Sequence, residues 1–146
     1  MQVDPAHRAI ASLQRLAEIF AERRRQLAAA AGLTEAQWRV LEEVGGDGFL
    51  PSMFARRRAI TAAAVSRTLR HLLDLGLVQS SIGTGDSRER HYRLTAKGRR
   101  AIATVEAARE TAVKEVWESL PVGELEEFSR FSDELSQRLE GLAKTR

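Results

Sequence analysis

Hydrophobic residues recur at intervals of three and four along most of the chain, which is the spacing of amphipathic helices. The first such stretch covers residues 6–31 and contains Ile10, Leu13, Leu16, Phe20 and Leu27. A second helix is expected after Thr34, because Thr34 and Gln37 form a capping-box pattern. The stretch from Pro51 to Arg58 predicts a short third helix, since proline suits the first turn of a helix.

The following segment predicts a fourth helix and then a hairpin. Thr61 is the expected N-cap of this helix, Gly76 its end, and its buried stripe consists of Val65, Leu69 and Leu72. The hydrophobic period then changes to two over residues 78–82 and again over 91–94. A glycine-rich, charged segment joins these two runs, so we predict two short strands in a hairpin.

Two more helices complete the pattern. Thr95 is placed to cap a long fifth helix, Pro121 breaks it, and a last amphipathic helix follows. The sequence therefore predicts a mainly α protein with a small β-hairpin, in which a winged helix-turn-helix at residues 34–98 is flanked by helices at 6–31 and 99–142. These outer helices have apolar stripes that one small core cannot cover, so we expect them to dimerise two copies of the chain, each a single domain of residues 1–146.

The distribution of charge favours a polyanionic partner. Residues 51–100 contain eleven basic and three acidic side chains, a net charge of +8, whereas the whole chain of 146 residues carries +3 at pH 7. Such a block is typical of nucleic-acid binding, although a solvated helix face has the same composition.

Other features of the sequence exclude several classes of protein. The chain has no cysteine, no apolar run of the length that spans a bilayer and no secretory signal pattern at residues 1–5, so we expect a cytoplasmic protein with no membrane association. His7, His71 and His91 lack the spacing of metal ligands, so we predict no metal site, no catalytic residue and no cofactor.

Three motifs at fixed intervals make the chain similar to the MarR family of transcriptional regulators. They are Gly76-Leu77-Val78, Asp86-Ser87-Arg88 and Leu94-Thr95-Ala96-Lys97-Gly98, and the intervals from Val78 to Asp86 and from Asp86 to Thr95 match those of the family. The resemblance covers nearly the whole chain. Ser80 departs from it, because the family often has arginine there, and this change removes one expected phosphate contact.

The resemblance implies binding to double-stranded DNA at a pseudo-palindromic operator. The fourth helix would enter the major groove, where Arg67 is the candidate to contact guanine or, alternatively, phosphate. Arg88 at the hairpin tip would enter the minor groove, and Asp86 would stabilise the wing through an ion pair with an arginine. The candidate DNA-binding residues are Arg56, Arg57, Thr61, Ala62, Ala63, Ser66, Arg67, Arg70, Ser87, Arg88 and Arg90.

A small-molecule effector is the other partner that the resemblance implies, in a crevice between the dimerisation helices and the DNA-binding lobe. Phe20, Arg23 and Trp38 are the candidate ligand-binding residues, although Trp38 also fits a purely structural place in the core. The leading hypothesis is thus a homodimeric, ligand-responsive repressor. A winged-helix module that binds proteins is the alternative, and the chain shows no phosphate loop or nucleophile–base pair that would indicate an enzyme.

Overall fold

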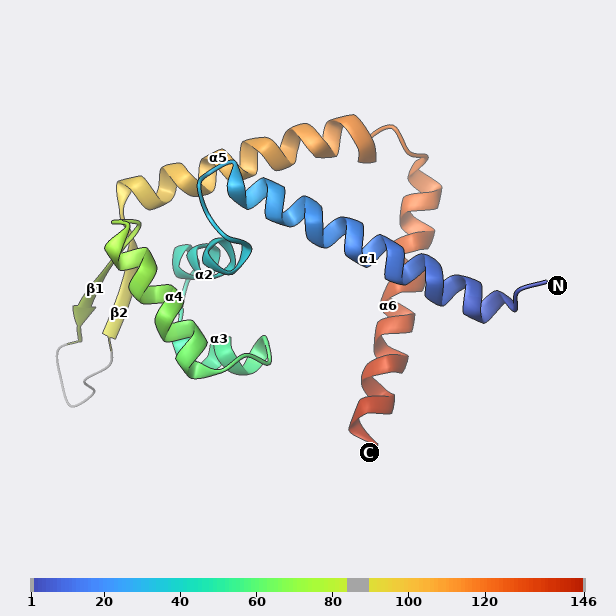
Figure 1. Ribbon diagram of the computed structural model, residues 1–146, viewed down its shortest axis with the longest axis horizontal. Helices are drawn as coiled ribbons and strands as arrows, with labels where there is room; N and C mark the ends of the chain where they lie inside the picture. Colours follow the sequence, from blue (N-terminus) through green and yellow to red (C-terminus); the bar gives the residue numbers. More distant parts are fainter. Residues whose placement is uncertain (1, 84–89, 146) are drawn as a thin grey trace. The chain divides into compact units, whose positions relative to one another are not determined.

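The computed structural model describes residues 2–83 and 90–145 (Figure 1). The chain divides into two compact units, residues 1–108 and 109–146. The elements of the first unit are α1 (Pro5–Ala29), α2 (Glu35–Gly45), α3 (Pro51–Arg57), α4 (Ala62–Asp74), β1 (Val78–Ile82), β2 (Arg90–Leu94) and most of α5 (Ala96–Ala112). The predicted winged helix-turn-helix is therefore confirmed, with helix ends within about two residues of those expected for the first four helices.

Local capping fixes where α2 begins. The backbone N–H of Gln37 donates to Thr34 Oγ1 at 3.1 Å, and the N–H of Thr34 donates to Gln37 Oε1 at 2.9 Å. This reciprocal pair satisfies two donors that the first turn of a helix otherwise leaves unpaired. The capping box predicted from the sequence is thus present in the structure.

The two ends of α4 also follow their sequence signals. Thr61 Oγ1 accepts a hydrogen bond from the N–H of Ala64 at 3.1 Å, which makes Thr61 the N-cap. At the other end, Gly76 has a φ of 72°, and the N–H of Leu77 donates to the carbonyl of Leu72 at 2.9 Å. This is a Schellman closure, and it positions the start of β1 directly after the helix.

The turn between α3 and α4 contains an unusual residue. Ala59 has a φ of 53°, and it is the one non-glycine residue with a positive φ in the described chain. The N–H of Ile60 donates to the carbonyl of Ala55 at 3.0 Å, so α3 ends with the same closure as α4 but with alanine where glycine is usual. The turn of the helix-turn-helix is therefore held in a conformation that L residues disfavour.

Strands β1 and β2 form the predicted antiparallel hairpin. Val78 pairs with Leu94, Ser80 with Tyr92, and Ile82 with Arg90. Val78 is buried, whereas Ile82 is 71% exposed. The hairpin is thus packed on the core at Val78 and exposed to solvent at Ile82.

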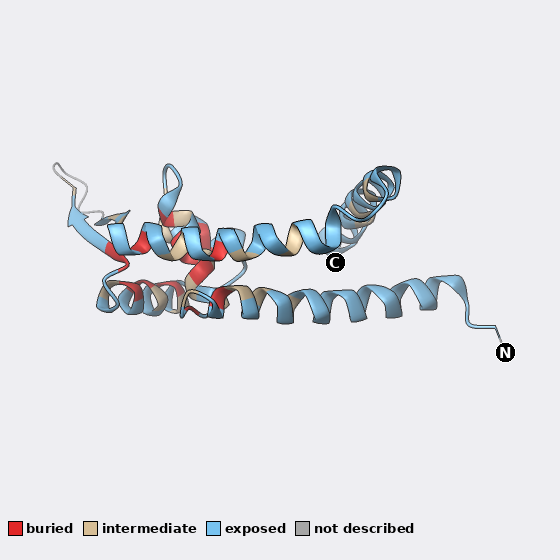
Figure 2. Ribbon diagram, turned by 90° about the horizontal axis from the view of Figure 1, so that it is seen from above, coloured by how far each residue is buried: buried red, intermediate tan, exposed pale blue. Residues whose placement is uncertain are grey.

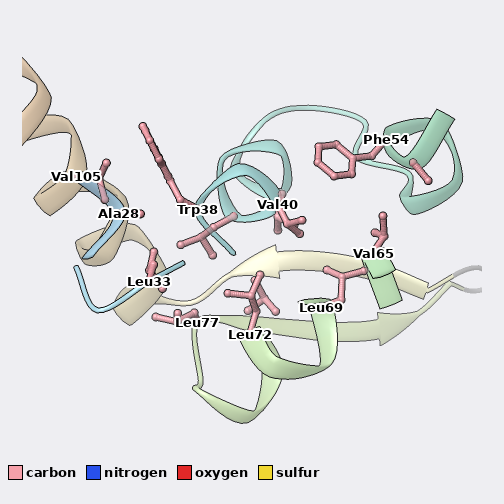
Figure 3. Close-up of a cluster of buried hydrophobic side chains, with 14 residues drawn as sticks. Ala28, Leu33, Trp38, Val40, Phe54, Val65, Leu69, Leu72, Leu77 and Val105 are labelled. Atoms are coloured by element: carbon pink, nitrogen blue, oxygen red, sulfur yellow. The ribbon is translucent and has the colours of Figure 1, made fainter. Parts of the chain in front are cut away.

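The core of the first unit gathers side chains from five helices and the base of the hairpin (Figure 3). Its largest fully buried side chains are Trp38, Phe54, Leu41, Leu72, Val65 and Val105. The end of α1 joins this core through Ala28, which lies near Val105 of α5 (Figure 3). The inward positions predicted for α4 are confirmed.

The rest of α1 is exposed along most of its length (Figure 2). Its apolar stripe, which the sequence pattern identified, is half accessible: Ile10, Leu13, Leu16, Ile19 and Phe20 are each between 45% and 53% exposed. Helices that keep such a stripe exposed are typical of surfaces that pack against another copy or another protein.

The second unit contains a π-helical turn, η1 (Val113–Trp117), and α6 (Val122–Lys144), which begins after Pro121. The break at Pro121 was expected, but the π-helical turn was not, because no residue pattern in this segment marks it. On α6, Phe128, Phe131, Leu139 and Leu142 are between 49% and 61% exposed. In the part of the chain that the structure describes, no helix is long and apolar enough to cross a membrane.

Candidate nucleic-acid interface and ligand cavities

One face of α4 is exposed and bears the residues expected to contact DNA. Val65, Leu69 and Leu72 are buried, so the opposite face is free to approach another surface. The predicted residues exposed here are Thr61, Ala62, Ala63, Ser66, Arg67 and Arg70. Thr61 already uses its hydroxyl oxygen to cap the helix, whereas Ala62 and Ala63 are small enough to allow close approach of the helix start.

The arginines near this face differ in their partners. Arg57 donates to Glu43 Oε2 at 3.0 Å, so its charge is partly satisfied within the protein. Among residues 2–83 and 90–145, Arg56, Arg67 and Arg70 form no ion pair, and neither does Arg90 on β2. Exposed, unpaired guanidinium groups beside the amino-terminal part of a helix suit contacts to phosphates and base edges.

Three predicted residues of the hairpin tip, Asp86, Ser87 and Arg88, lie outside the described residues. Their expected roles in stabilising the wing and contacting DNA therefore stay predictions.

A cavity lies between α1 and α2, and we name it the crevice cavity. Its volume is about 490 Å³, and its lining residues are Ala17, Phe20, Ala21, Arg24, Glu35, Arg39, Glu42 and Arg58. Apolar side chains of α1 form one wall, while three arginines and two glutamates surround the remainder. The lining thus combines an apolar wall with charged groups of both signs.

The charged groups of the crevice cavity centre on Glu35. Arg24 donates from Nε to Glu35 Oε1 at 2.9 Å, and Arg39 donates from Nη2 to the same oxygen at 2.7 Å. Burial alone would raise the pKa of Glu35, but these hydrogen bonds and the charges of the two arginines outweigh it and lower the pKa below its ordinary value. Glu35 therefore stays ionised at neutral pH and holds both arginines at the cavity.

Trp38 lies beneath this network. Its ring is 1% exposed, and the Cζ of Arg24 lies 4.3 Å from the ring centroid, in the geometry of a cation–π contact. The indole N–H is buried without a hydrogen-bond partner in the described part of the chain. The structure thus places Trp38 in the core, where it supports Arg24.

The candidate ligand residues are placed differently from one another. Phe20 lines the crevice cavity, whereas Arg23 is exposed and donates to Gln26 Oε1 at 2.7 Å. Arg24 was missed by sequence reasoning, although it lies four residues after Phe20 and therefore on the same helix face. The periodicity alone did not separate it from Arg23, because residues three and four apart share a face equally.

Among the described residues, no three histidine, aspartate or glutamate side chains lie together in a group that could hold a metal ion. The charged groups described above are instead the exposed arginines of α4 and the side chains that line the crevice cavity.

Sequence comparisons relate this chain to transcription regulators. The model of the MarR family matches residues 31–89. The HTH-type transcriptional regulator PetP of Rhodobacter capsulatus is 51% identical over 39 residues, which are 27% of this chain and 24% of that protein, so the match spans about a quarter of the relative's length.

Solved structures extend the likeness to the whole fold. The Staphylococcus aureus MarR, solved in complex with salicylate and kanamycin, is 16% identical with a TM-score of 0.80, over 93% of each chain. Streptococcus pneumoniae FabT, solved in complex with DNA, is 18% identical with a TM-score of 0.78, over 94% of this chain and 99% of that chain. At these identities the likeness concerns the fold.

Proposed function

We propose that this chain is a transcription regulator of the MarR family, whose model matches residues 31–89, and that it binds a two-fold symmetric DNA site as a homodimer. Transcription of the adjacent genes would be repressed until a small anionic ligand weakens DNA binding. The observation that carries this proposal is the exposed face of α4, on which Arg67 and Arg70 form no ion pair with the described residues. This face is one helix wide, as entry into a major groove requires.

Dimerisation is supported by the exposed apolar side chains of α1 and α6. Burying apolar surface stabilises by about 25 cal/mol per Å², so stripes of this kind favour a second copy over water. Sedimentation at micromolar concentration should give a dimer of a 16.2 kDa chain. A stable monomer under these conditions would contradict the proposal.

DNA binding is tested by selection from a random duplex pool, followed by titration at several salt concentrations. The enriched site should be an inverted repeat whose half-site centres lie about 34–36 Å apart, because a two-fold dimer presents its two α4 helices to successive major grooves. The affinity should fall steeply with salt, by about 0.9 in log K per unit of log salt for each phosphate neutralised. A protein-binding module would enrich no sequence.

The ligand response is supported by the crevice cavity. Arg24 and Arg39 are held there by Glu35, and the Staphylococcus aureus relative was solved with salicylate, an aromatic carboxylate. We propose an aromatic acid as the ligand class, with its carboxylate at the arginines and its ring against Phe20. A ligand can shift the protein only as far as its affinity differs between the DNA-binding state and the other state.

The matched test uses Phe20→Ala, which widens the crevice cavity, and Met53→Ala, which shortens an exposed apolar side chain of α3 that does not line it. Salicylate should lower the DNA affinity of the unchanged protein and of Met53→Ala, and it should have a weaker effect on Phe20→Ala. An equal response of all three proteins would remove the crevice cavity from the mechanism without affecting the proposal of DNA binding.

A further inference from the structure

Glu43, near the C-terminal end of α2, pairs with two arginines at the end of α3. Arg57 donates from Nη2 to Glu43 Oε2 at 3.0 Å, and Nη2 of Arg58 lies 3.8 Å from Glu43 Oε1. No other carboxylate of the described residues forms an ion pair with either guanidinium group. A single carboxylate of α2 thus holds two of the three consecutive arginines that close α3.

The carboxylate is the more firmly placed member of these pairs. The side chain of Glu43 is 27% exposed, whereas those of Arg57 and Arg58 are 62% and 45% exposed. Arg58 has a second contact, because its Cζ lies 5.9 Å from the centroid of the Phe54 ring. The side chain of Arg57 has the hydrogen bond to Glu43 as its one polar contact within the described part of the chain. Loss of the Glu43 charge would therefore free Arg57 first.

The stability of the fold gives little reason for this pair. Glu43 lies two residues before Gly45, the last residue of α2, where the helix dipole is negative and disfavours a carboxylate. An ion pair with an exposed partner such as Arg57 contributes little to stability, because water screens the charges and the long side chains lose freedom. The larger effect of the pair is expected where the charge of Arg57 meets another anion.

Arg57 lies beside the part of the protein that is proposed to approach DNA. It is the last residue of α3, four positions before Thr61, the N-cap of α4. Helices α3 and α4 also contact each other (Figure 1). A guanidinium next to the first turn of a groove-reading helix suits a contact to phosphate. A DNA phosphate must here compete with the Glu43 carboxylate for the same group.

We infer that Glu43 keeps Arg57 from contacting the DNA backbone and thereby limits the affinity of the protein for DNA. The inference rests on the DNA binding proposed above and adds to it a positioning residue that does not itself touch DNA. Phosphate contacts carry no sequence information, so a free Arg57 would strengthen binding to any duplex. Because a genome contains far more non-specific sites than operators, the carboxylate reduces the share of the protein that is held at them.

The experiment measures the affinity of the whole protein for the duplex enriched by selection and for a scrambled duplex of equal length, at several salt concentrations. Glu43→Gln removes the carboxylate charge and keeps the size of the side chain. We expect this variant to bind both duplexes about fivefold or more tightly than the unchanged protein, since a further phosphate is neutralised. The fall of log K with log salt should steepen by about 0.9 for each Arg57 that contacts a phosphate.

Two further variants separate the release of Arg57 from the change in net charge. Asp47→Asn removes one negative charge from an exposed residue that has no ion pair among the described residues, and it should bind DNA within about twofold of the unchanged protein. Arg57→Gln should lower the affinity about fivefold in the Glu43→Gln background but about twofold or less in the unchanged protein. This difference between the two backgrounds measures how strongly Glu43 restrains Arg57.

The inference is overturned if Glu43→Gln binds DNA no more tightly than Asp47→Asn, or if Arg57→Gln lowers the affinity equally in both backgrounds. A gain confined to the enriched duplex would make Arg57 a base contact and would also overturn it. If neither the unchanged protein nor any variant binds either duplex, the proposed DNA binding itself fails.

Thermal melts establish that each variant folds. If Glu43→Gln does not fold, Arg57→Gln in the unchanged background decides the question. A loss of about fivefold or more in that variant would show that Arg57 already contacts DNA while Glu43 is present, which overturns the inference.

Discussion

The Nζ of Lys97, in the first turn of α5, lies 2.7 Å from the carbonyl oxygen of Leu75, at the C-terminal end of α4. Next to this contact, Thr95 Oγ1 donates to the carbonyl of Gly76 at 2.6 Å and accepts from the N–H of Gly98 at 3.0 Å. The end of α4 leaves carbonyls that its own helix cannot satisfy, and the start of α5 supplies their donors. The Leu-Thr-x-x-Gly motif thus fastens α5 to the helix proposed to read DNA.

Lys97→Met should loosen this attachment while keeping most of the side-chain length. We expect the free energy of unfolding to fall by about 0.5–1.5 kcal/mol, the usual contribution of a hydrogen bond. The substitution also removes a positive charge from the negative end of the α4 dipole, which acts in the same direction. Urea denaturation measures this change. Lys114→Met, which alters an exposed lysine of η1, is the matched control, and an equal loss in both would contradict the attachment.

Gly98→Ala should be far more damaging. A Cβ at Gly98 would collide with the carbonyl oxygen of Leu77, which is backbone and cannot move aside as a side chain would. Overpacking of this kind usually costs about 1–3 kcal/mol, and a clash with backbone belongs at the upper end. Gly141→Ala in α6, where a Cβ would meet nothing within 4 Å, should leave the protein as stable or slightly more stable. Equal melting temperatures for the two variants would contradict this account of Gly98.

Elements with local signals could be predicted from the sequence, and the structure shows why. The capping box at Thr34, the N-cap at Thr61 and the closure at Gly76 each depend on residues within a few positions of one another. The alternation over β1 and β2 was equally local. Hydrophobic spacing, caps and turn residues therefore sufficed for the order of the elements and for the inward face of α4.

The crevice cavity could not be predicted, because it depends on contacts between distant segments. Arg24 meets Glu35 across eleven positions, and Arg58 reaches this cavity from the end of α3. Periodicity did not distinguish Arg23 from Arg24. The positive φ of Ala59 carried no signal either, since glycine or asparagine usually marks such a position.

Ala59→Gly should stabilise the protein. The left-handed conformation costs an L residue about 1–2 kcal/mol, while the greater freedom of glycine in the unfolded chain costs about 0.4–1 kcal/mol. The net gain should be about 0.5–1 kcal/mol, measured by chemical denaturation. Ala103→Gly, in the interior of α5, should have the opposite sign, because there the backbone is helical and glycine only adds entropy to the unfolded state. A destabilised Ala59→Gly would show that the positive φ is not strained.

The Glu35 carboxylate should make the stability depend on pH in the acid range. Its pKa is lowered in the folded state, so its contribution is complete above the ordinary carboxyl pKa of about 4.3 and is lost as the pH falls through the folded value. Glu35→Gln should therefore be less stable than the unchanged protein at pH 7, by about 1 kcal/mol for these partly exposed ion pairs.

The difference between the two proteins should shrink as the pH is lowered below about 4, since both then have a neutral side chain at this position. Denaturation curves at a series of pH values measure it. Glu106→Gln, on the exposed surface of α5 and without an ion pair in the described chain, is the control and should follow the unchanged protein throughout. A constant difference between Glu35→Gln and the unchanged protein at all pH values would exclude Glu35 as its source.

Arg67 and Arg88 should contribute to DNA recognition in different ways. Arg67 is exposed on α4 without an ion pair among the described residues, so Arg67→Ala should relax the preference at one base position per half-site, by about 1–3 kcal/mol if the contact to guanine is bidentate. Arg88→Ala should instead lower affinity for most sequences and weaken the preference for A·T-rich flanks, because an arginine in the minor groove senses groove width and potential. Binding-site selection with each variant separates the two patterns, and thermal melts show whether either change affects folding.

Uniform loss of affinity in Arg67→Ala, with all base preferences kept, would make Arg67 a phosphate contact. Unchanged affinity and flank preference in Arg88→Ala would mean that the hairpin does not read DNA.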